Sequence, residues 1–175
     1  MTKGIILFQS KYGATKRYAD WLIEETGFDL IETKKAKIDN LIGYDTIILG
    51  GGIYASNIAG IDFLRKNINS FKGKKNIVFC VGASPYDDKS FKEIYNRNFK
   101  DTLSNIKCFY CRGSWNEEVM TLRDKILCKF IKKMLLKKDP SNYEIWETAL
   151  MESFGEKCDW TDKKNLDSII KFIKE

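Results

Sequence analysis

Short hydrophobic runs alternate along the chain with longer stretches in which apolar residues recur at helical spacing. Five runs predict buried strands, over residues 4–9, 28–33, 44–49, 76–81 and 107–112. The helical spacing predicts helices over residues 15–26, 61–71, 90–99 and 162–174. Strands that alternate with helices form a parallel sheet covered on both faces, and continuously apolar strands fit such burial. The pattern therefore predicts an α/β fold.

One stretch, residues 116–160, interrupts this alternation between the fifth strand and the last helix. Its first half predicts a helix because four apolar residues recur at helical spacing: Leu122, Ile126, Phe130 and Met134. A turn at residues 138–142 and a short helix over 143–154 complete it. We interpret residues 1–175 as a single domain and residues 116–160 as a helical insertion within it.

The composition excludes several kinds of site. The chain has 175 residues, 43% of them hydrophobic and 13% aromatic, which is typical of a globular domain. It has no histidine, which excludes a Ser-His-Asp or Cys-His site and any histidine-ligated metal. No catalytic residue and no metal ligand is predicted. There is neither a membrane-spanning apolar run nor a signal-peptide pattern, so we expect a cytoplasmic protein.

The five cysteines include Cys108 and Cys111, which have the Cys-x-x-Cys spacing. Both lie in the predicted strand 107–112, where residues three apart point to opposite faces. That arrangement is unsuited to a shared metal or a disulfide, so we predict buried structural thiols. The odd number of cysteines favours a reducing compartment.

The positive charge is concentrated in the insertion. Residues 119–138 contain seven basic residues and one acid, Asp124, so this segment carries the whole net charge of +6. On a helical projection four lysines fall on one arc opposite the apolar stripe: Lys125, Lys129, Lys132 and Lys133. Two interpretations stay open, contact with an anionic membrane surface and a core-packed helix with a solvated lysine face. Nucleic-acid binding is not predicted, because no exposed aromatics are interleaved with the bases.

Three loops follow strands at the edge where α/β sheets bind ligands. The first, Ser10-Lys11-Tyr12-Gly13-Ala14-Thr15, enters the first helix and combines hydroxyls, a glycine and the free N–H groups of a helix start. That combination binds phosphate. The loop lacks the Gly-x-Gly-x-x-Gly and Gly-Lys-Ser/Thr signatures of nucleotide sites. The alternative is an ordinary strand-to-helix turn.

The other two loops each supply glycines and a tyrosine. In Gly50-Gly51-Gly52-Ile53-Tyr54 the glycines allow close backbone approach to a flat ligand, and Tyr54 is a candidate stacking ring. In Gly82-Ala83-Ser84-Pro85-Tyr86, Tyr86 is the candidate for the other ring face. For residues 50–54 the alternative is a flexible turn with a core tyrosine. We interpret Asp87 and Asp88 as the start of a helix rather than as catalytic acids.

Taken together, the loops resemble those of the flavodoxin family. The first is similar to its Thr/Ser-x-Thr/Tyr-Gly-x-Thr phosphate loop, and the others fall where its isoalloxazine loops fall, over roughly residues 3–115 and 161–174. The resemblance implies a three-layer α/β/α fold, a five-stranded parallel sheet in the order 2-1-3-4-5, and bound FMN that transfers electrons. It implies cofactor contacts from Ser10, Lys11, Tyr12, Gly13, Ala14 and Thr15 at the phosphate, from Gly51, Gly52, Ile53 and Tyr54 near N5, and from Ala83, Ser84 and Tyr86 at the pyrimidine end.

The insertion adds a second resemblance. A basic amphipathic segment after the fifth strand, followed by Asp159-Trp160-Thr161-Asp162, is similar to the pattern of flavodoxin-like, quinone-dependent protoporphyrinogen dehydrogenases. This implies an enzyme at the membrane surface that passes electrons to a quinone. The flavodoxin resemblance alone implies a carrier with a redox partner protein. A third alternative is an interaction module without flavin, because a fold does not fix a function.

Overall fold

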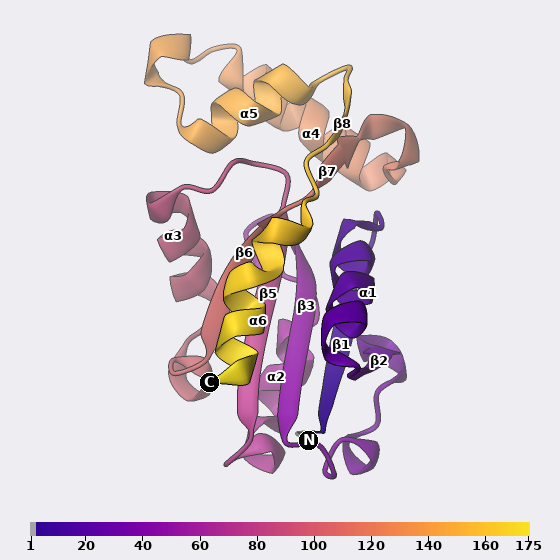
Figure 1. Cartoon of the computed structure of the whole chain (residues 1–175). Helices are drawn as coiled ribbons and strands as arrows, with labels where there is room; N and C mark the ends of the chain where they lie inside the picture. Colours follow the sequence, from indigo (N-terminus) through magenta and orange to yellow (C-terminus); the bar gives the residue numbers. More distant parts are fainter. Residues whose placement is uncertain (1–2) are drawn as a thin grey trace.

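The computed structural model describes residues 3–175, and a five-stranded parallel sheet forms its centre (Figure 1). The parallel strands are β1 (Gly4–Gln9), β2 (Asp29–Glu32), β3 (Thr46–Tyr54), β5 (Lys75–Gly82) and β6 (Lys107–Arg112). Their order is β2-β1-β3-β5-β6, which confirms the predicted 2-1-3-4-5 arrangement. Three short strands were not predicted: β4 (Asn57–Ile58), β7 (Ser114–Asn116) and β8 (Lys157–Asp159).

Helices cover both faces of this sheet (Figure 1). They are α1 (Ala14–Thr26), α2 (Ile61–Asn67), α3 (Asp88–Asn98) and α6 (Asp167–Lys174). On one face, Tyr18 and Leu22 of α1 are buried together with Ile169 of α6. On the other face, Leu64 of α2 is buried with Phe99 at the end of α3. The predicted helix 61–71 is α-helical only to Asn67 and continues as the 3₁₀ turn Ile68–Phe71.

The predicted separation of the two cysteines is confirmed. Cys111 is buried on the α1 and α6 face of the sheet, whereas Cys108 packs against the cluster on the opposite face. Burial raises the pKa of the Cys111 thiol, so it stays protonated at neutral pH. All five cysteines are free.

The glycine run after the third strand is not a loop, which corrects the prediction for residues 50–54. Gly50, Gly51 and Gly52 lie inside β3. A Cβ atom on Gly50 would stand 2.1 Å from the Phe79 ring, and one on Gly51 would stand 2.2 Å from the Ala59 carbonyl oxygen. The glycines therefore make room for their neighbours within a buried strand. The chain turns instead at Ala55 and Ser56, between β3 and β4, with φ values of 48° and 62°.

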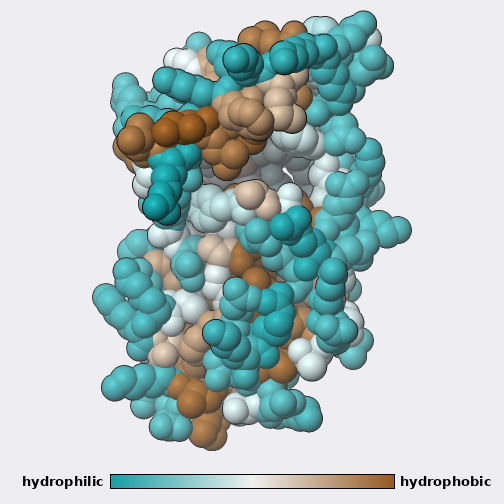
Figure 2. All heavy atoms as spheres, turned by 180° about the vertical axis from the view of Figure 1, so that it is seen from behind, coloured by the Kyte–Doolittle hydropathy of each residue, from teal (hydrophilic) through white to brown (hydrophobic). Residues whose placement is uncertain are grey.

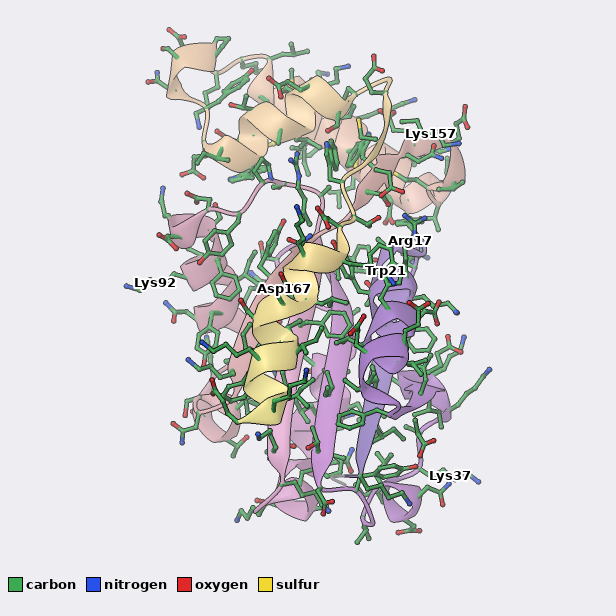
Figure 3. All side chains as sticks on the ribbon, in the orientation of Figure 1. Arg17, Trp21, Lys37, Lys92, Lys157 and Asp167 are labelled. Carbon is green, nitrogen blue, oxygen red and sulfur yellow. The ribbon has the colours of Figure 1, made fainter. Side chains whose placement is uncertain are left out.

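The insertion lies beyond the carboxyl ends of the strands (Figure 1). It contains α4 (Leu122–Leu135) and α5 (Ile145–Ser153), and β7 pairs with β8 at its base. Its return segment is tied to the sheet domain. Arg17 of α1 forms an ion pair with Asp159 at 2.5 Å, and the Trp160 amide donates to the Gly113 carbonyl at 3.0 Å. Figure 3 shows Arg17 at the end of α1 that faces the insertion.

The apolar stripe predicted for α4 is on the outside, so the interpretation as a core-packed helix is wrong. Its members, Leu122, Ile126, Phe130 and Met134, are 73%, 58%, 60% and 55% exposed. The prediction that the lysines lie opposite this stripe is also wrong. At 100° per residue, Lys129 and Lys133 fall beside Leu122 and Ile126. Lys125 and Lys132 are half-buried. Lys125 donates to the Glu118 carbonyl at 3.2 Å, and the Lys132 ammonium lies 4.4 Å from the centre of the Phe154 ring.

Within residues 3–175, no helix combines the length and the apolar character needed to cross a lipid bilayer.

Candidate functional site

A cavity of about 500 Å³ lies between the carboxyl edge of the sheet and the insertion. Its floor comes from the loops after β1, β3 and β5, and its roof comes from α4 and α5. The volume falls in the range of small-molecule and cofactor sites, roughly 300–1,000 Å³. The hollow beneath the insertion is visible in Figure 2.

Ten of the thirteen residues predicted to contact a cofactor line this cavity. They are Ser10, Tyr12, Ala14, Thr15, Gly52, Ile53, Tyr54, Ala83, Ser84 and Tyr86. The other three lie elsewhere. Gly13 borders a neighbouring open groove, Lys11 extends toward α4, and Gly51 is enclosed in β3 against Ala59.

The loop from β1 to α1 has the features of a phosphate site. Gly13 occupies the position before the helix with a φ of 97°, and its N–H donates to the Ser10 hydroxyl at 3.1 Å. No described side chain caps the first turn of α1, and that turn has no acidic residue. Its N–H groups are therefore available to an anion. Thr15, which is 3% exposed, adds a hydroxyl at the cavity wall.

Two tyrosines border the cavity from different loops. The Tyr54 hydroxyl accepts a hydrogen bond from the Lys11 backbone N–H at 3.2 Å, and its ring packs edge-on to Tyr12 at 6.2 Å. Burial raises the pKa of Tyr54, so this hydroxyl stays neutral. Tyr86 is 56% exposed and packs against Tyr110 at 5.9 Å. These rings offer apolar surface to a flat ligand.

Asp124 of α4 connects the insertion to the phosphate loop. Its carboxylate accepts hydrogen bonds from the Lys11 ammonium and from the Tyr12 hydroxyl. The Tyr12 hydroxyl in turn accepts from the Thr121 N–H at 3.2 Å. The bond to Lys11, and then the bond to Tyr12, lower the pKa of Asp124, and the bond to Asp124 raises the pKa of Lys11. We call this group of Lys11, Tyr12 and Asp124 the latch.

Sequence reasoning did not assign the latch. The signal that could have found it is that Asp124 is the only acidic residue in the basic segment 119–138. In the sequence, the basic residues of the same segment are the obvious partners for this carboxylate, so the pattern does not single out Lys11. Its interaction with a loop more than a hundred residues away depends on the fold, which local spacing does not encode.

The roof of the cavity is apolar and also was not assigned. Leu127 and Ile131 of α4 and Trp146 and Leu150 of α5 contribute to it. Trp115, 8% exposed, lines the same cavity, and its indole N–H is buried without a hydrogen-bond partner among the described residues. A buried donor without a partner is costly, and an acceptor on a ligand would remove that cost.

Comparison with known proteins identifies the family. A family model described as "Flavodoxin domain" matches residues 5–143, and the chain belongs to this family. No curated protein matches it.

The solved structures to which this chain is similar include flavoproteins of low sequence identity. A two-electron reduced flavodoxin from Megasphaera elsdenii is 16% identical, with 61% of this chain and 84% of that chain covered and a TM-score of 0.48. A putative flavoprotein from Bacteroides eggerthii is 18% identical, with coverages of 74% and 96% and a TM-score of 0.48.

The cofactor of the chain is FMN, as its family indicates. The residues present fit this group. The uncapped start of α1 and Thr15 suit the phosphate, and the apolar cavity between Tyr54 and Tyr86 suits the ring system. When bound, FMN supplies the electron chemistry, and the protein supplies binding, orientation and electrostatics.

The latch leads to a first prediction. Asp124→Asn removes the ion pair with Lys11, so we expect the insertion to open more often and α4 amides to exchange hydrogen about fivefold faster at pH 7. Hydrogen–deuterium exchange of the full chain measures this. Asp20→Asn is the control, because it breaks the exposed Lys16–Asp20 pair on α1 and leaves α4 unchanged. Equal α4 exchange in the wild type and Asp124→Asn would contradict the latch.

The contribution of the latch to stability is limited to a defined range of pH. The pKa of Asp124 is lowered, so its contribution is present above the unfolded value of about 3.9 and is lost as the pH falls through the folded value. The pKa of Lys11 is raised, so its contribution is present below about 10.4 and is lost as the pH rises through the folded value. We expect the difference between wild type and Asp124→Asn to persist between these limits.

Proposed function

We propose that the protein transfers electrons through FMN held in the cavity between the sheet and the insertion. The observation that carries this proposal is the convergence of a phosphate-type loop and two tyrosine-bearing loops on one cavity of about 500 Å³. Thr15 and the start of α1 hold the phosphate, and Tyr54 and Tyr86 border the ring system. The apolar roof limits the access of water to the flavin.

The absorption spectrum of the purified protein tests the proposal. We expect flavin bands in the visible region that survive desalting after incubation with FMN. We further expect the bands to bleach on anaerobic reduction by dithionite and to return with an electron acceptor. A protein that stays colourless after incubation with FMN would contradict the proposal and would favour an interaction module without flavin.

The electron acceptor separates two versions of this function. A carrier would deliver electrons to a redox partner protein, which requires the flavin edge to be accessible. The second candidate is a quinone-linked dehydrogenase of the protoporphyrinogen-oxidising type. It is favoured by the apolar roof of Leu127, Ile131, Trp146 and Leu150, which gives a bulky apolar molecule a surface beside the flavin.

Pre-reduced protein distinguishes the two versions. For the dehydrogenase, we expect the reduced flavin to be reoxidised faster by a soluble quinone than by cytochrome c. In a separate anaerobic experiment that starts from the oxidised flavin, we expect protoporphyrinogen to reduce it. Ile131→Asp should slow the quinone reaction, because it places a charge in the apolar roof. Retention of the flavin spectrum controls for the integrity of the cavity. Reoxidation by cytochrome c alone would favour the carrier.

A further inference from the structure

The outer face of α4 is an exposed hydrophobic band. Leu122, Ile126, Phe130 and Met134 recur every four residues, and each of them is more than half exposed. Figure 2 shows hydrophobic residues gathered in a band across the insertion, above the hollow of the cavity. Contiguous exposed apolar surface on a soluble domain is typical of an interaction site. The described remainder of the chain does not cover this band.

Basic side chains border the band on the same helix. At 100° per residue, Lys129 and Lys133 fall beside Leu122 and Ile126 on the helix circumference, and Arg123 lies within the apolar arc. All three are exposed. The acid of this segment, Asp124, is occupied by Lys11 and Tyr12 on the other side of the helix. The surface is therefore both apolar and strongly positive.

We propose that this face of α4 binds an anionic lipid bilayer with the helix lying in the plane of the surface. Its apolar residues would reach the boundary of the acyl chains, and the long lysine side chains would extend to the headgroup phosphates. Negative surface potential attracts such a basic segment. The fourteen residues of α4 suit a helix lying on the surface.

Charge argues against a second copy of the chain as the occupant. A symmetric dimer through this face would bring the lysines and the arginine of both copies together, and like charges across an interface are repulsive. A lipid surface supplies the opposite charge over the whole length of the helix. The inner side of α4 lines the cavity through Cys128 and Ile131, so bilayer contact would place the cavity roof next to the lipid.

Vesicle co-sedimentation of the full chain tests the proposal, with phosphatidylcholine vesicles that contain phosphatidylserine compared with pure phosphatidylcholine. We expect wild type to prefer the anionic vesicles. Lys129→Glu/Lys133→Glu should weaken vesicle binding about a hundredfold or more. Each basic residue near the lipid surface raises the binding constant about fivefold, and this variant reverses two such charges. Ile126→Gln/Phe130→Gln should weaken it by tens of fold at unchanged net charge.

The matched control is Lys37→Glu/Lys92→Glu, which makes the same change in net charge at two exposed lysines outside the insertion (Figure 3). We expect it to change binding by only a fewfold. Equal binding by the control and the Lys129/Lys133 variant would overturn the proposal, as would equal binding by wild type and the Gln variant. A dimer in sedimentation equilibrium that the Gln variant dissociates would also overturn it, in favour of a second copy.

This test is independent of the cofactor. The substituted side chains are exposed, so the variants should keep both the fold and the flavin spectrum. Loss of vesicle binding with an intact spectrum would support the lipid surface without bearing on electron transfer. Absence of vesicle binding in the wild type would overturn the lipid proposal and leave the redox function standing.

Discussion

Gly13→Val is expected to weaken FMN binding about a hundredfold. Gly13 has a φ of 97°, a region that a β-branched residue avoids. Forcing valine there costs about 1–3 kcal/mol, and relaxation of the loop would turn the N–H groups of α1 away from the phosphate. A Cβ at Gly13 meets nothing within 4 Å, so the expected loss comes from backbone conformation rather than from a clash.

Thr15→Val tests the same loop without backbone strain. Valine keeps the shape of this buried residue and removes only the hydroxyl. A hydrogen bond to a charged group is worth about 1.5–3 kcal/mol, so we expect FMN affinity to fall by roughly 10- to 100-fold. Riboflavin lacks the phosphate, so its affinity should be the same in both proteins. Fluorescence titration with the two ligands measures this difference.

Gly73→Val is the matched control for Gly13→Val. Gly73 also has a positive φ, 78°, and open space around its Cβ position, but it precedes β5 at the other end of the sheet. We expect a similar loss of folding stability with unchanged FMN affinity. Unchanged FMN affinity in both Gly13→Val and Thr15→Val would contradict the assignment of this loop to the phosphate.

The topology was predictable because it depends on patterns that are local in sequence. Each parallel strand is a continuous apolar run, and the helices between them show one apolar face. Right-handed crossovers between parallel strands then leave few possible arrangements. The phosphate-type loop was predictable for the same reason, since Ser10, Gly13 and Thr15 lie within six residues of one another.

Features that depend on distant partners were not predictable. Gly50 is required by Phe79 on β5, which is distant in the sequence. Gly51 is required by the Ala59 carbonyl, which reaches it only because the chain turns back at Ala55 and Ser56. The orientation of α4 was ambiguous because apolar residues occur around more than one side. Leu127, Ile131 and Leu135 form a second series four residues apart. Leu127 and Ile131 line the cavity, and Leu135 is buried, 5% exposed.

Gly51→Ala is expected to destabilise the fold by about 3 kcal/mol or more. The added Cβ would lie 2.2 Å from the Ala59 carbonyl oxygen, which is a backbone atom held in place by the hydrogen bond from the Ala59 N–H to the Gly52 carbonyl at 2.9 Å. A side chain can rotate away from a clash, whereas this carbonyl can move only if the β3–β4 hairpin moves with it. Urea unfolding gives the free energy of unfolding.

Alanine substitutions at two further glycines serve as comparisons for Gly51→Ala. Gly50→Ala meets the ring of Phe79, which can shift, so we expect a loss of about 2 kcal/mol, smaller than for Gly51→Ala. Gly43→Ala has open space and an ordinary φ, so its stability should be unchanged or slightly increased. If Gly51→Ala lost no more stability than Gly43→Ala, the β4 hairpin could not cover β3 as described. The rim of the cavity at Ala55 and Ser56, which this hairpin positions, would then need to be placed differently.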